Sequence, residues 1–240
     1  MGTEVCDLKI TEIFKSIEGE GIRTGRICTF IRSFGCPLRC TFCDSMYSNE
    51  KEPDQIILDL SVEEIVQECK KLKTPYVTFT GGEPLIQKDA NELIERLLEE
   101  GFFVNIETSG ACDISAVHEY LASKKKHPLM DNLIFTVDYK SYTSKCTGLM
   151  IMDNFLKHVR STDVVKFVVG TKQDLDQMKH IVELIQDAKK EFQPHFFVSP
   201  VFGMIEMTDI IDYLKDNDLF DIQFQIQLHK VVWDPNRRGV

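Results

Sequence analysis

The chain reads Gly35-Cys36-Pro37-Leu38-Arg39-Cys40-Thr41-Phe42-Cys43-Asp44 directly after a run of β-branched and aromatic residues, 28–32, that predicts a strand. Three cysteines fall within eight residues of this segment, and the proline and arginine between them are typical of an exposed loop. Three thiolates in one loop can converge on one inorganic centre. A structural zinc site normally has four protein ligands, so three cysteines indicate a centre with one open position.

A 4Fe–4S cubane fits this pattern, because three thiolates hold three irons and leave the fourth open to a small molecule. The amino and carboxylate groups of methionine can chelate that iron, and Phe42 can pack on an adenine ring. Two alternatives remain at this point, namely a chance cluster of buried thiols and a zinc site with a distant fourth ligand. That ligand would be Cys28, Cys69, Cys112 or a histidine. The five cysteines outside the loop are expected to be inert thiols.

Strands and helices alternate outward from this loop. Further strands are predicted over 76–80, 103–107, 133–137, 164–169, 195–198 and 224–228, and helices over 61–71, 89–100, 115–124, 174–190 and 208–217. Ser61 and Glu64 form a capping box, and Gly101 ends a helix. Six or seven such units are too few for a closed eightfold barrel of about 250 residues. We therefore expect one domain over 1–240, a partial, open parallel β/α barrel, with ligands at the carboxyl ends of its strands.

Composition narrows the class of protein. The 240 residues include 28 basic and 38 acidic side chains, a net charge of −10 that argues against non-specific binding to nucleic acid. No run approaches the roughly 20 apolar residues of a membrane span, and the first residues lack the features of a signal peptide. We therefore expect a cytoplasmic protein without membrane association, whose eight cysteines are thiols or metal ligands rather than disulfides.

A second element follows the strand 76–80, where the chain reads Gly81-Gly82-Glu83-Pro84. Glycine lets the backbone approach a ligand closely, and the carbonyl groups there can accept from an ammonium group. The spacing of the cysteines, the aromatic residue before the last of them and this element together resemble the radical SAM (S-adenosylmethionine) superfamily. The expected fold is therefore a barrel of the radical SAM type.

The segment Ser16-Ile17-Glu18-Gly19-Glu20-Gly21 has exposed backbone and carboxylates that suit the donor edge of a pterin or guanine-like ring. Arg32 can pair with a substrate carboxylate in a bidentate manner. Taken with Ile-Glu-Thr-Ser-Gly at 106–110 and Gln-Leu-His-Lys at 227–230, these motifs resemble the 7-carboxy-7-deazaguanine synthase family over nearly the whole chain.

The resemblance implies a lyase that converts 6-carboxy-5,6,7,8-tetrahydropterin to 7-carboxy-7-deazaguanine with release of ammonia, on the pathway to 7-deazapurines such as queuosine. It implies a 4Fe–4S cluster on Cys36, Cys40 and Cys43, Mg²⁺ on Ser45, and no catalytic side chain beyond the cluster and SAM. It implies substrate contacts at Ile17, Glu18, Gly19, Glu20, Arg32, Thr80 and the terminal carboxylate of Val240. It implies SAM contacts at Phe42, Cys43, Asp44, Gly82, Glu83, Ser109, Asp138, Tyr139, Lys140, Ser199, Pro200, Val201 and Phe202. A homodimer and a flavodoxin or ferredoxin reductant are also implied.

Some of these positions depart from the family pattern or have plainer interpretations. Glu18 stands where the family often has glutamine, Ser45 where it usually has threonine, and only Lys140 is shared with a Ser-Pro-Lys segment. On the residues alone, Arg32 fits a surface ion pair, Ser45 a polar turn and His229 a structural hydrogen bond. The two rival functions are another small radical SAM enzyme, such as one that activates a glycyl radical in a partner protein, and a zinc-binding interaction module.

Overall fold

The computed structural model describes residues 8–234 and 237–239. These residues form a nine-stranded sheet in the order β3-β1-β2-β4-β5-β6-β7-β8-β9. In the part of the sheet that runs β2-β4-β5-β6-β7-β8-β9, each pair of neighbouring strands is parallel. Strand β1 pairs antiparallel with β2 and with β3. The strands are β1 (Leu8–Ile17), β2 (Ile27–Ser33), β3 (Leu58–Leu60), β4 (Tyr76–Gly81), β5 (Phe103–Thr108), β6 (Leu133–Tyr139), β7 (Val164–Val169), β8 (His195–Pro200) and β9 (Ile222–Phe224).

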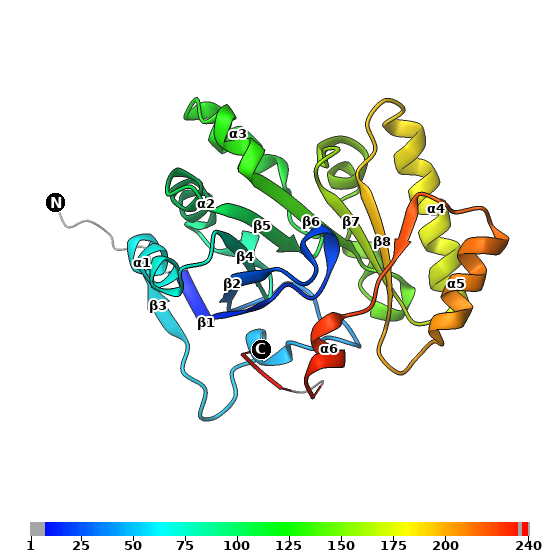
Figure 1. The fold of residues 1–240 in the computed structure, drawn as a ribbon, viewed down its shortest axis with the longest axis horizontal. Helices are drawn as coiled ribbons and strands as arrows, with labels where there is room; N and C mark the ends of the chain where they lie inside the picture. Colours follow the sequence, from blue (N-terminus) through cyan, green and yellow to red (C-terminus); the bar gives the residue numbers. More distant parts are fainter. Residues whose placement is uncertain (1–7, 235–236, 240) are drawn as a thin grey trace.

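The helices are α1 (Val62–Leu72), α2 (Ala90–Glu99), α3 (Ser115–Ser123), α4 (Lys172–Ala188), α5 (Met207–Asp216) and α6 (Leu228–Val232). Helices α1 to α5 lie on one side of the sheet, and the short C-terminal α6 lies on the other, as Figure 1 shows. The sheet does not close, since β3 and β9 are its two edges. The expected open, partial barrel is therefore confirmed.

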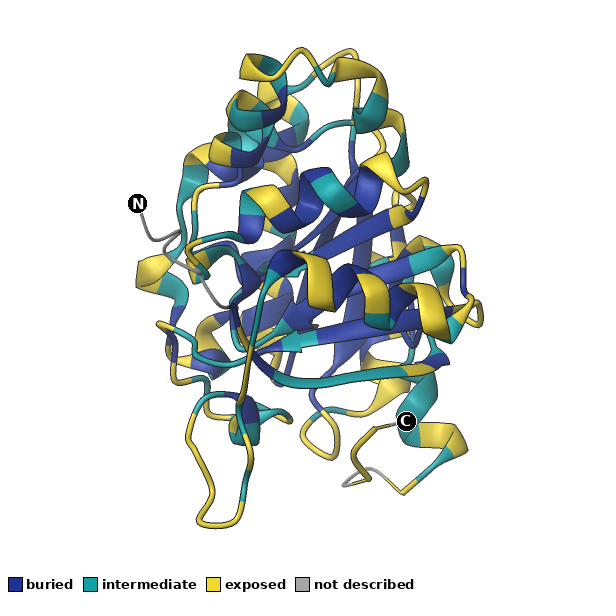
Figure 2. Cartoon of the chain, turned by 90° about the vertical axis from the view of Figure 1, so that its left-hand side faces the viewer, coloured by how far each residue is buried: buried dark blue, intermediate teal, exposed yellow. Residues whose placement is uncertain are grey.

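The core lies between the sheet and its helices, where Figure 2 shows the strands as the most buried part of the chain. Helices α1 to α5 contribute buried apolar residues to it: α1 buries Val62, Ile65, Val66 and Cys69, which recur at the spacing of an amphipathic helix. All six residues of β7 are buried, including the charged Lys166. The capping box of Ser61 and Glu64 is present at the start of α1.

The predicted order of strands and helices is confirmed from α1 to α5, and β2 is also where it was expected, but the prediction misses β1 and β3 and misplaces β9. The strand expected over 224–228 is instead β9, which ends at Phe224; the Gln225 amide makes one more bond, to Val198 O, and α6 begins at Leu228. The antiparallel strands β1 and β3 were not predicted. The burial of β1 alternates only at its first residues, so its sequence lacks a clear period of two.

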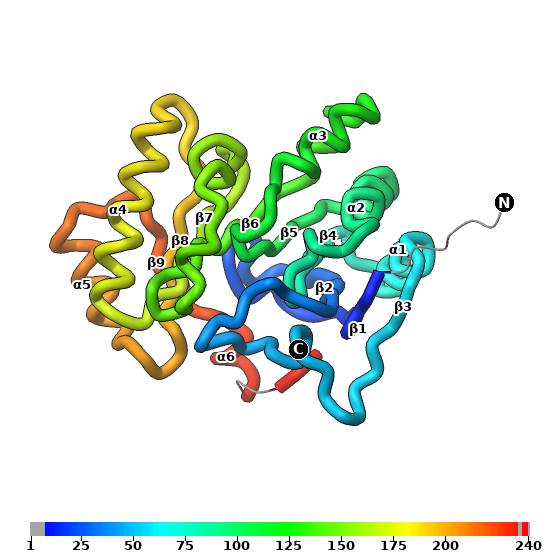
Figure 3. Tube along the Cα trace, turned by 180° about the vertical axis from the view of Figure 1, so that it is seen from behind, coloured from blue at the N-terminus to red at the C-terminus, as the bar shows by residue number. Residues whose placement is uncertain are grey.

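This topology brings the cysteine loop, the glycine element and the ends of β5, β6 and β8 to one edge of the sheet, since parallel strands end together. The segment after β2 and helix α6 lie next to each other on the side away from α1–α5, in Figure 1 and in the reverse view of Figure 3. No helix in the described part of the chain is long and apolar enough to cross a membrane.

Candidate active site

A cavity of about 710 Å³ lies at the carboxyl ends of the parallel strands. Side chains from β2, β4, β5, β6 and β7 form its floor, and the cysteine loop and the C-terminal segment form its walls. Most of the residues predicted to bind substrate, SAM or metal line this one cavity. These are Ile17, Glu18, Gly19, Glu20, Arg32, Cys36, Cys40, Phe42, Cys43, Asp44, Ser45, Thr80, Gly82, Ser109, Asp138, Lys140, Val201 and Phe202.

The three thiols of the cysteine loop are partly buried on the cavity wall. Burial raises the pKa of Cys36 and raises that of Cys40 to about 12, so a metal centre must displace protons there. Within the described residues, no group of three or more His, Cys, Asp and Glu side chains could hold a metal ion. A cubane takes its thiolates at separate corners, so its ligands are spread more widely than those of one ion.

The donor set of this wall fits an iron–sulfur cluster with a chelating ligand. Among the described residues, three soft thiolates and no fourth cysteine line the cavity. Two buried acceptors on the same wall, Asn49 Oδ1 and Asp138 Oδ1, have no hydrogen-bond partner within the described residues. Unpaired buried acceptors are costly, and donor groups of a bound ligand would satisfy them.

The glycine element joins β4 to the cysteine loop. The amide of Gly82 donates to Ser33 O (3.1 Å) and that of Glu83 to Gly35 O (2.8 Å). A Cβ atom at Gly82 would lie 2.1 Å from Gly35 O, so no other residue fits this approach. The Glu83 carboxylate is fully buried behind the wall, where it accepts from the Ser109 amide (2.8 Å) and hydroxyl (2.6 Å) and from Thr108 Oγ1 (2.9 Å). It thus holds Ser109 in place.

A buried charge network crosses the cavity floor. Lys166 Nζ lies 3.1 Å from Glu20 Oε2 and 3.9 Å from Asp138 Oδ2, and Lys140 Nζ lies 2.8 Å from Asp138 Oδ2. Burial alone would lower the pKa of Lys166, but Glu20, Glu107 and Asp138 raise it well above its ordinary value. Lys166 is therefore a permanent cation that several buried acids share.

Arg32 is held at the cavity edge by residues of β1 and of the segment after the cysteine loop. Its Nε donates to Glu12 Oε1 (2.7 Å), which also accepts from Tyr47 OH (2.7 Å). The guanidinium lies 5.8 Å from the Tyr47 ring centroid and 5.8 Å from that of Phe14. The hydrogen bond to Glu12 uses Nε. The two terminal guanidinium nitrogens can therefore still donate side by side to the two oxygens of a carboxylate.

The C-terminal segment covers the cavity mouth. Lys230 Nζ pairs with Asp44 Oδ2 at 2.8 Å, and both terminal nitrogens of Arg238 pair with Glu52 at 2.7 and 2.8 Å. His229 packs so closely on Gly19 that a Cβ there would lie 2.3 Å from His229 Nδ1. The expected contact of the Val240 carboxylate lies outside the described residues.

The structure places four predicted residues off the cavity wall. Tyr139 is buried against Phe155 and Phe167, Ser199 donates to Glu20 Oε1 at 3.4 Å, and Pro200 ends β8. Glu83 is the fourth, as described above.

Several residues that build the site were given no role from the sequence, and five of them contact or orient its charged groups. Four of these five, Tyr47, Glu107, Lys166 and Gln227, line the cavity, and Glu12 orients Arg32. A signal existed for Lys166, because it is the one charged residue in the apolar run 164–169.

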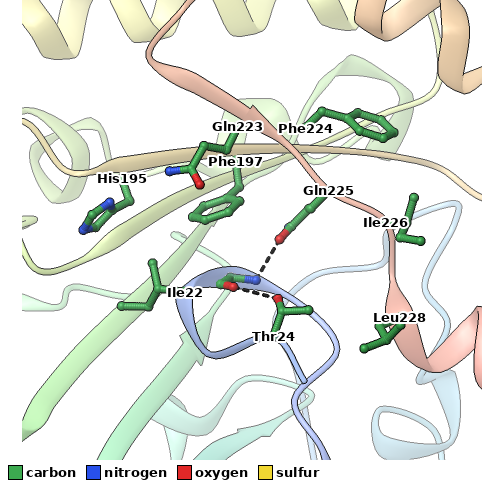
Figure 4. A pocket seen from close by; sticks show the side chains of 10 residues that line it. Ile22, Thr24, His195, Phe197, Gln223, Phe224, Gln225, Ile226 and Leu228 are labelled. Atoms are coloured by element: carbon green, nitrogen blue, oxygen red, sulfur yellow. Dashed lines mark hydrogen bonds between the residues drawn. The ribbon is translucent and has the colours of Figure 1, made fainter. Parts of the chain in front are cut away.

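A second pocket of about 630 Å³ lies at the open edge of the barrel, between residues 21–24 and the strands β8 and β9. Figure 4 shows that Gln225 reaches from the segment after β9 towards the backbone of the 21–24 turn. Its Oε1 accepts from the Gly21 amide (2.7 Å), and its Nε2 donates to Glu20 Oε1 (3.5 Å). Gln225 therefore separates this pocket from the main cavity and braces Glu20.

Comparisons with known proteins agree with this geometry. The family model of the radical SAM superfamily matches residues 30–139. The 7-carboxy-7-deazaguanine synthase of Clostridium acetobutylicum is 39% identical over 97% of this chain and 99% of its own length. The enzyme of the same name from Methanospirillum hungatei is 34% identical over 95% of this chain and 86% of its own. The crystal structure of QueE from Escherichia coli superposes with a TM-score of 0.65 at 22% identity, covering 93% of this chain and 95% of that one.

Proposed function

Because this chain belongs to the 7-carboxy-7-deazaguanine synthase family of radical SAM enzymes, we propose that it converts 6-carboxy-5,6,7,8-tetrahydropterin to 7-carboxy-7-deazaguanine with release of ammonia. The observation that carries this proposal is the single cavity that joins the cysteine loop to Glu20 and Arg32. One side of it suits SAM on a cluster, and the other suits a flat, polar heterocycle with a carboxylate.

The polar groups of the cavity match such a substrate. Arg32 supplies a fork for the carboxylate, and Glu20 supplies oxygens for the N–H edge of the ring. The Glu20 contacts to Lys166, Ser199, Gln225 and Gln227 are all 3.1 Å or longer, so substrate donors can compete for these oxygens. Phe14 and Phe30 stack with ring centroids 5.1 Å apart and offer an apolar face beside them.

The cluster would be held by Cys36, Cys40 and Cys43, with SAM between Phe42, Gly82, Ser109, Asp138 and Val201. When bound, the reduced cluster and SAM supply the radical chemistry that begins the ring contraction. The protein orients the two ligands and excludes water. The ion pairs of Lys230 with Asp44 and of Arg238 with Glu52 hold the C-terminal segment over the mouth for this purpose.

Anaerobic turnover tests the proposal directly. The enzyme reconstituted with iron and sulfide is expected to form 7-carboxy-7-deazaguanine and ammonia from the carboxy-tetrahydropterin when SAM, Mg²⁺ and a reductant are present. Product is identified by mass spectrometry, and the reaction without pterin is the control. Cleavage of SAM without any deazaguanine product would point instead to a radical SAM enzyme with another substrate.

We also propose that Ser45 binds Mg²⁺ beside the substrate carboxylate, because a hard cation prefers oxygen ligands and the Ser45 side chain makes no capping hydrogen bond. Ser45→Ala is expected to raise the Mg²⁺ concentration for half-maximal activity about tenfold, and Ser45→Thr is expected to keep it unchanged. A magnesium titration of kcat/KM measures both. Equal titration curves for the alanine variant and the parent enzyme would remove Ser45 from the metal site.

The same proposal extends to partners. A flavodoxin or ferredoxin would reduce the cluster, the enzyme would act as a homodimer, and its product would enter 7-deazapurine synthesis such as that of queuosine.

A further inference from the structure

Two glutamates stand two residues apart in the segment 16–21, which we call the substrate loop, and their surroundings differ. Glu20 is ion-paired with Lys166, as described above. Glu18 also lines the cavity but is only 2% exposed, and no ion pair among the described residues includes it. A buried carboxylate without a cation is unfavourable, so the surroundings of Glu18 decide which protonation state it adopts.

The hydrogen bonds of Glu18 come from neutral groups. Its Oε2 accepts from Thr78 Oγ1 of β4 at 2.5 Å and from Cys28 Sγ of β2 at 3.9 Å. Burial is the largest of the effects that raise the pKa of the Cys28 thiol, so this thiol stays protonated and remains a donor. Both donors serve the same oxygen, and a proton on Glu18 therefore belongs on the other one, Oε1.

The charges around Glu18 also oppose its ionisation. Glu107 of β5 and Glu20 of the substrate loop repel a negative charge there, and Lys166 of β7 attracts one but is already paired with Glu20. Arg23 of the turn 21–23 is a further cation that interacts electrostatically with Glu18. Burial is the largest effect, and together these groups raise the pKa of Glu18 from 4.5 to about 8.

We propose that Glu18 is an un-ionised carboxylic acid that donates a hydrogen bond from Oε1 to an acceptor atom of the bound pterin, while Glu20 accepts from the ring N–H groups. This inference rests on the proposed function. A pterin carries a carbonyl oxygen beside its N–H edge, so acceptor and donors lie side by side on one ring. Two carboxyl groups in different protonation states complement that edge, whereas two carboxylates would repel its oxygen.

Stability against pH tests the protonation state without any substrate. A carboxyl whose pKa is raised in the folded state costs no stability below the unfolded value, and the cost grows as pH rises from about 4.5 to about 8. Glu18→Gln keeps the shape and removes the titration. The melting temperature of the reconstituted variant is therefore expected to exceed that of the parent by about 5 °C or more at pH 8, with the gap narrowing steadily towards pH 5.5.

Glu68→Gln is the matched control, since the Glu68 side chain is half-exposed on α1 and, in the part of the chain that the structure describes, forms an ion pair only with Lys71. It should shift the melting temperature little at any pH. A gap between Glu18→Gln and the parent that stays constant with pH would show that Glu18 is ionised in the folded enzyme, and it would overturn the proposal.

Turnover tests the donated hydrogen bond. The parent's kcat/KM for the pterin should fall about tenfold per pH unit above about pH 8, and Glu18→Gln should lack this fall because its amide donates at every pH. Glu18→Met, which cannot donate, should lose about 10- to 100-fold in kcat/KM at pH 7, chiefly through KM. An unimpaired Glu18→Met enzyme would overturn the donor role.

The melting experiment and the turnover experiment together distinguish a failure of this inference from a failure of the proposed function. A parent enzyme that does not act on the pterin sinks both the proposed function and the donor role, even where the melting curves show a neutral Glu18. A parent enzyme that turns over normally, with pH-independent melting differences, sinks only the role of Glu18.

Discussion

The Cys40→Ala enzyme, treated anaerobically with iron and sulfide, is expected to stay colourless and to convert neither SAM nor pterin. Cys40 lines the cavity between Cys36 and Cys43 in the loop that follows β2. Removal of one of three thiolates leaves two corners of a cubane without protein ligands, so the cluster is not retained. Iron and sulfide content, visible absorbance and product formation measure the loss, and turnover should fall below detection.

Cys112→Ala is the matched control for this experiment. Cys112 lies near Cys36 but does not line the cavity, and it would be a fourth ligand if the loop held zinc. The control should keep its cluster, colour and turnover. If Cys40→Ala retained iron, sulfide and activity, the ligand assignment would be wrong; if Cys112→Ala lost its metal, a four-ligand site would replace the cluster.

Replacement of Lys166 by methionine is expected to have the second largest effect. The side chain is only 8% exposed and its ammonium group is surrounded by Glu20, Glu107 and Asp138. Methionine fills similar space without charge, so Glu20 loses its ion-pair partner and Glu107 loses the attraction of the Lys166 charge, while Asp138 keeps its ion pair with Lys140. Loss of one partner from a buried ion pair costs about 3–5 kcal/mol. The free energy of unfolding should fall by this amount at pH 7, and kcat/KM by about 100-fold or more as Glu20 moves.

Two further variants make this result specific. Lys215→Met removes an exposed lysine that pairs with Asp212 on α5, and it should leave the free energy of unfolding nearly unchanged. Glu20→Gln introduced with Lys166→Met should restore part of the stability, because one unpaired charge is removed, but not the turnover. A Lys166→Met enzyme as stable and active as the parent would show that the acids are neutral or solvated.

The local parts of the site could be predicted from the sequence. The cysteine loop and the glycine element each carry their chemistry within a few consecutive residues, and parallel strands bring both to one edge. The helix that begins with Ser61 was likewise predictable, because its capping box is a local hydrogen-bond pattern that the structure contains.

The residues that orient others could not be predicted in the same way. Glu12 acts on Arg32 across a strand pair, and Lys166 acts on Glu20 from a strand 146 positions further along the chain. Such partners meet only when the sheet has formed, and their side chains alone do not identify them. Glu18 is similar: a glutamate in a turn-like sequence gives no sign that Thr78 and Cys28 will bury it.

The ends of the fold escaped prediction for a different reason. β1 and β9 lie at or near the open edges, where only part of each strand is buried and the apolar pattern is weak. Gln225 and Leu228 read as a continuing strand, but Gln225 hydrogen-bonds the substrate loop and the chain turns into α6.

From β4 onward the spatial order of the strands repeats their order along the chain. During synthesis, each new strand can therefore add to the growing edge of a platform that is already in place, and most pairings join neighbours in sequence. The cavity is the exception, since Glu20 meets Ser199, Gln225 and Gln227 only after the chain has been made as far as residue 227. The sheet can thus form before the cavity is complete. The cysteine loop then stays accessible to iron delivery until the C-terminal segment covers the cavity mouth.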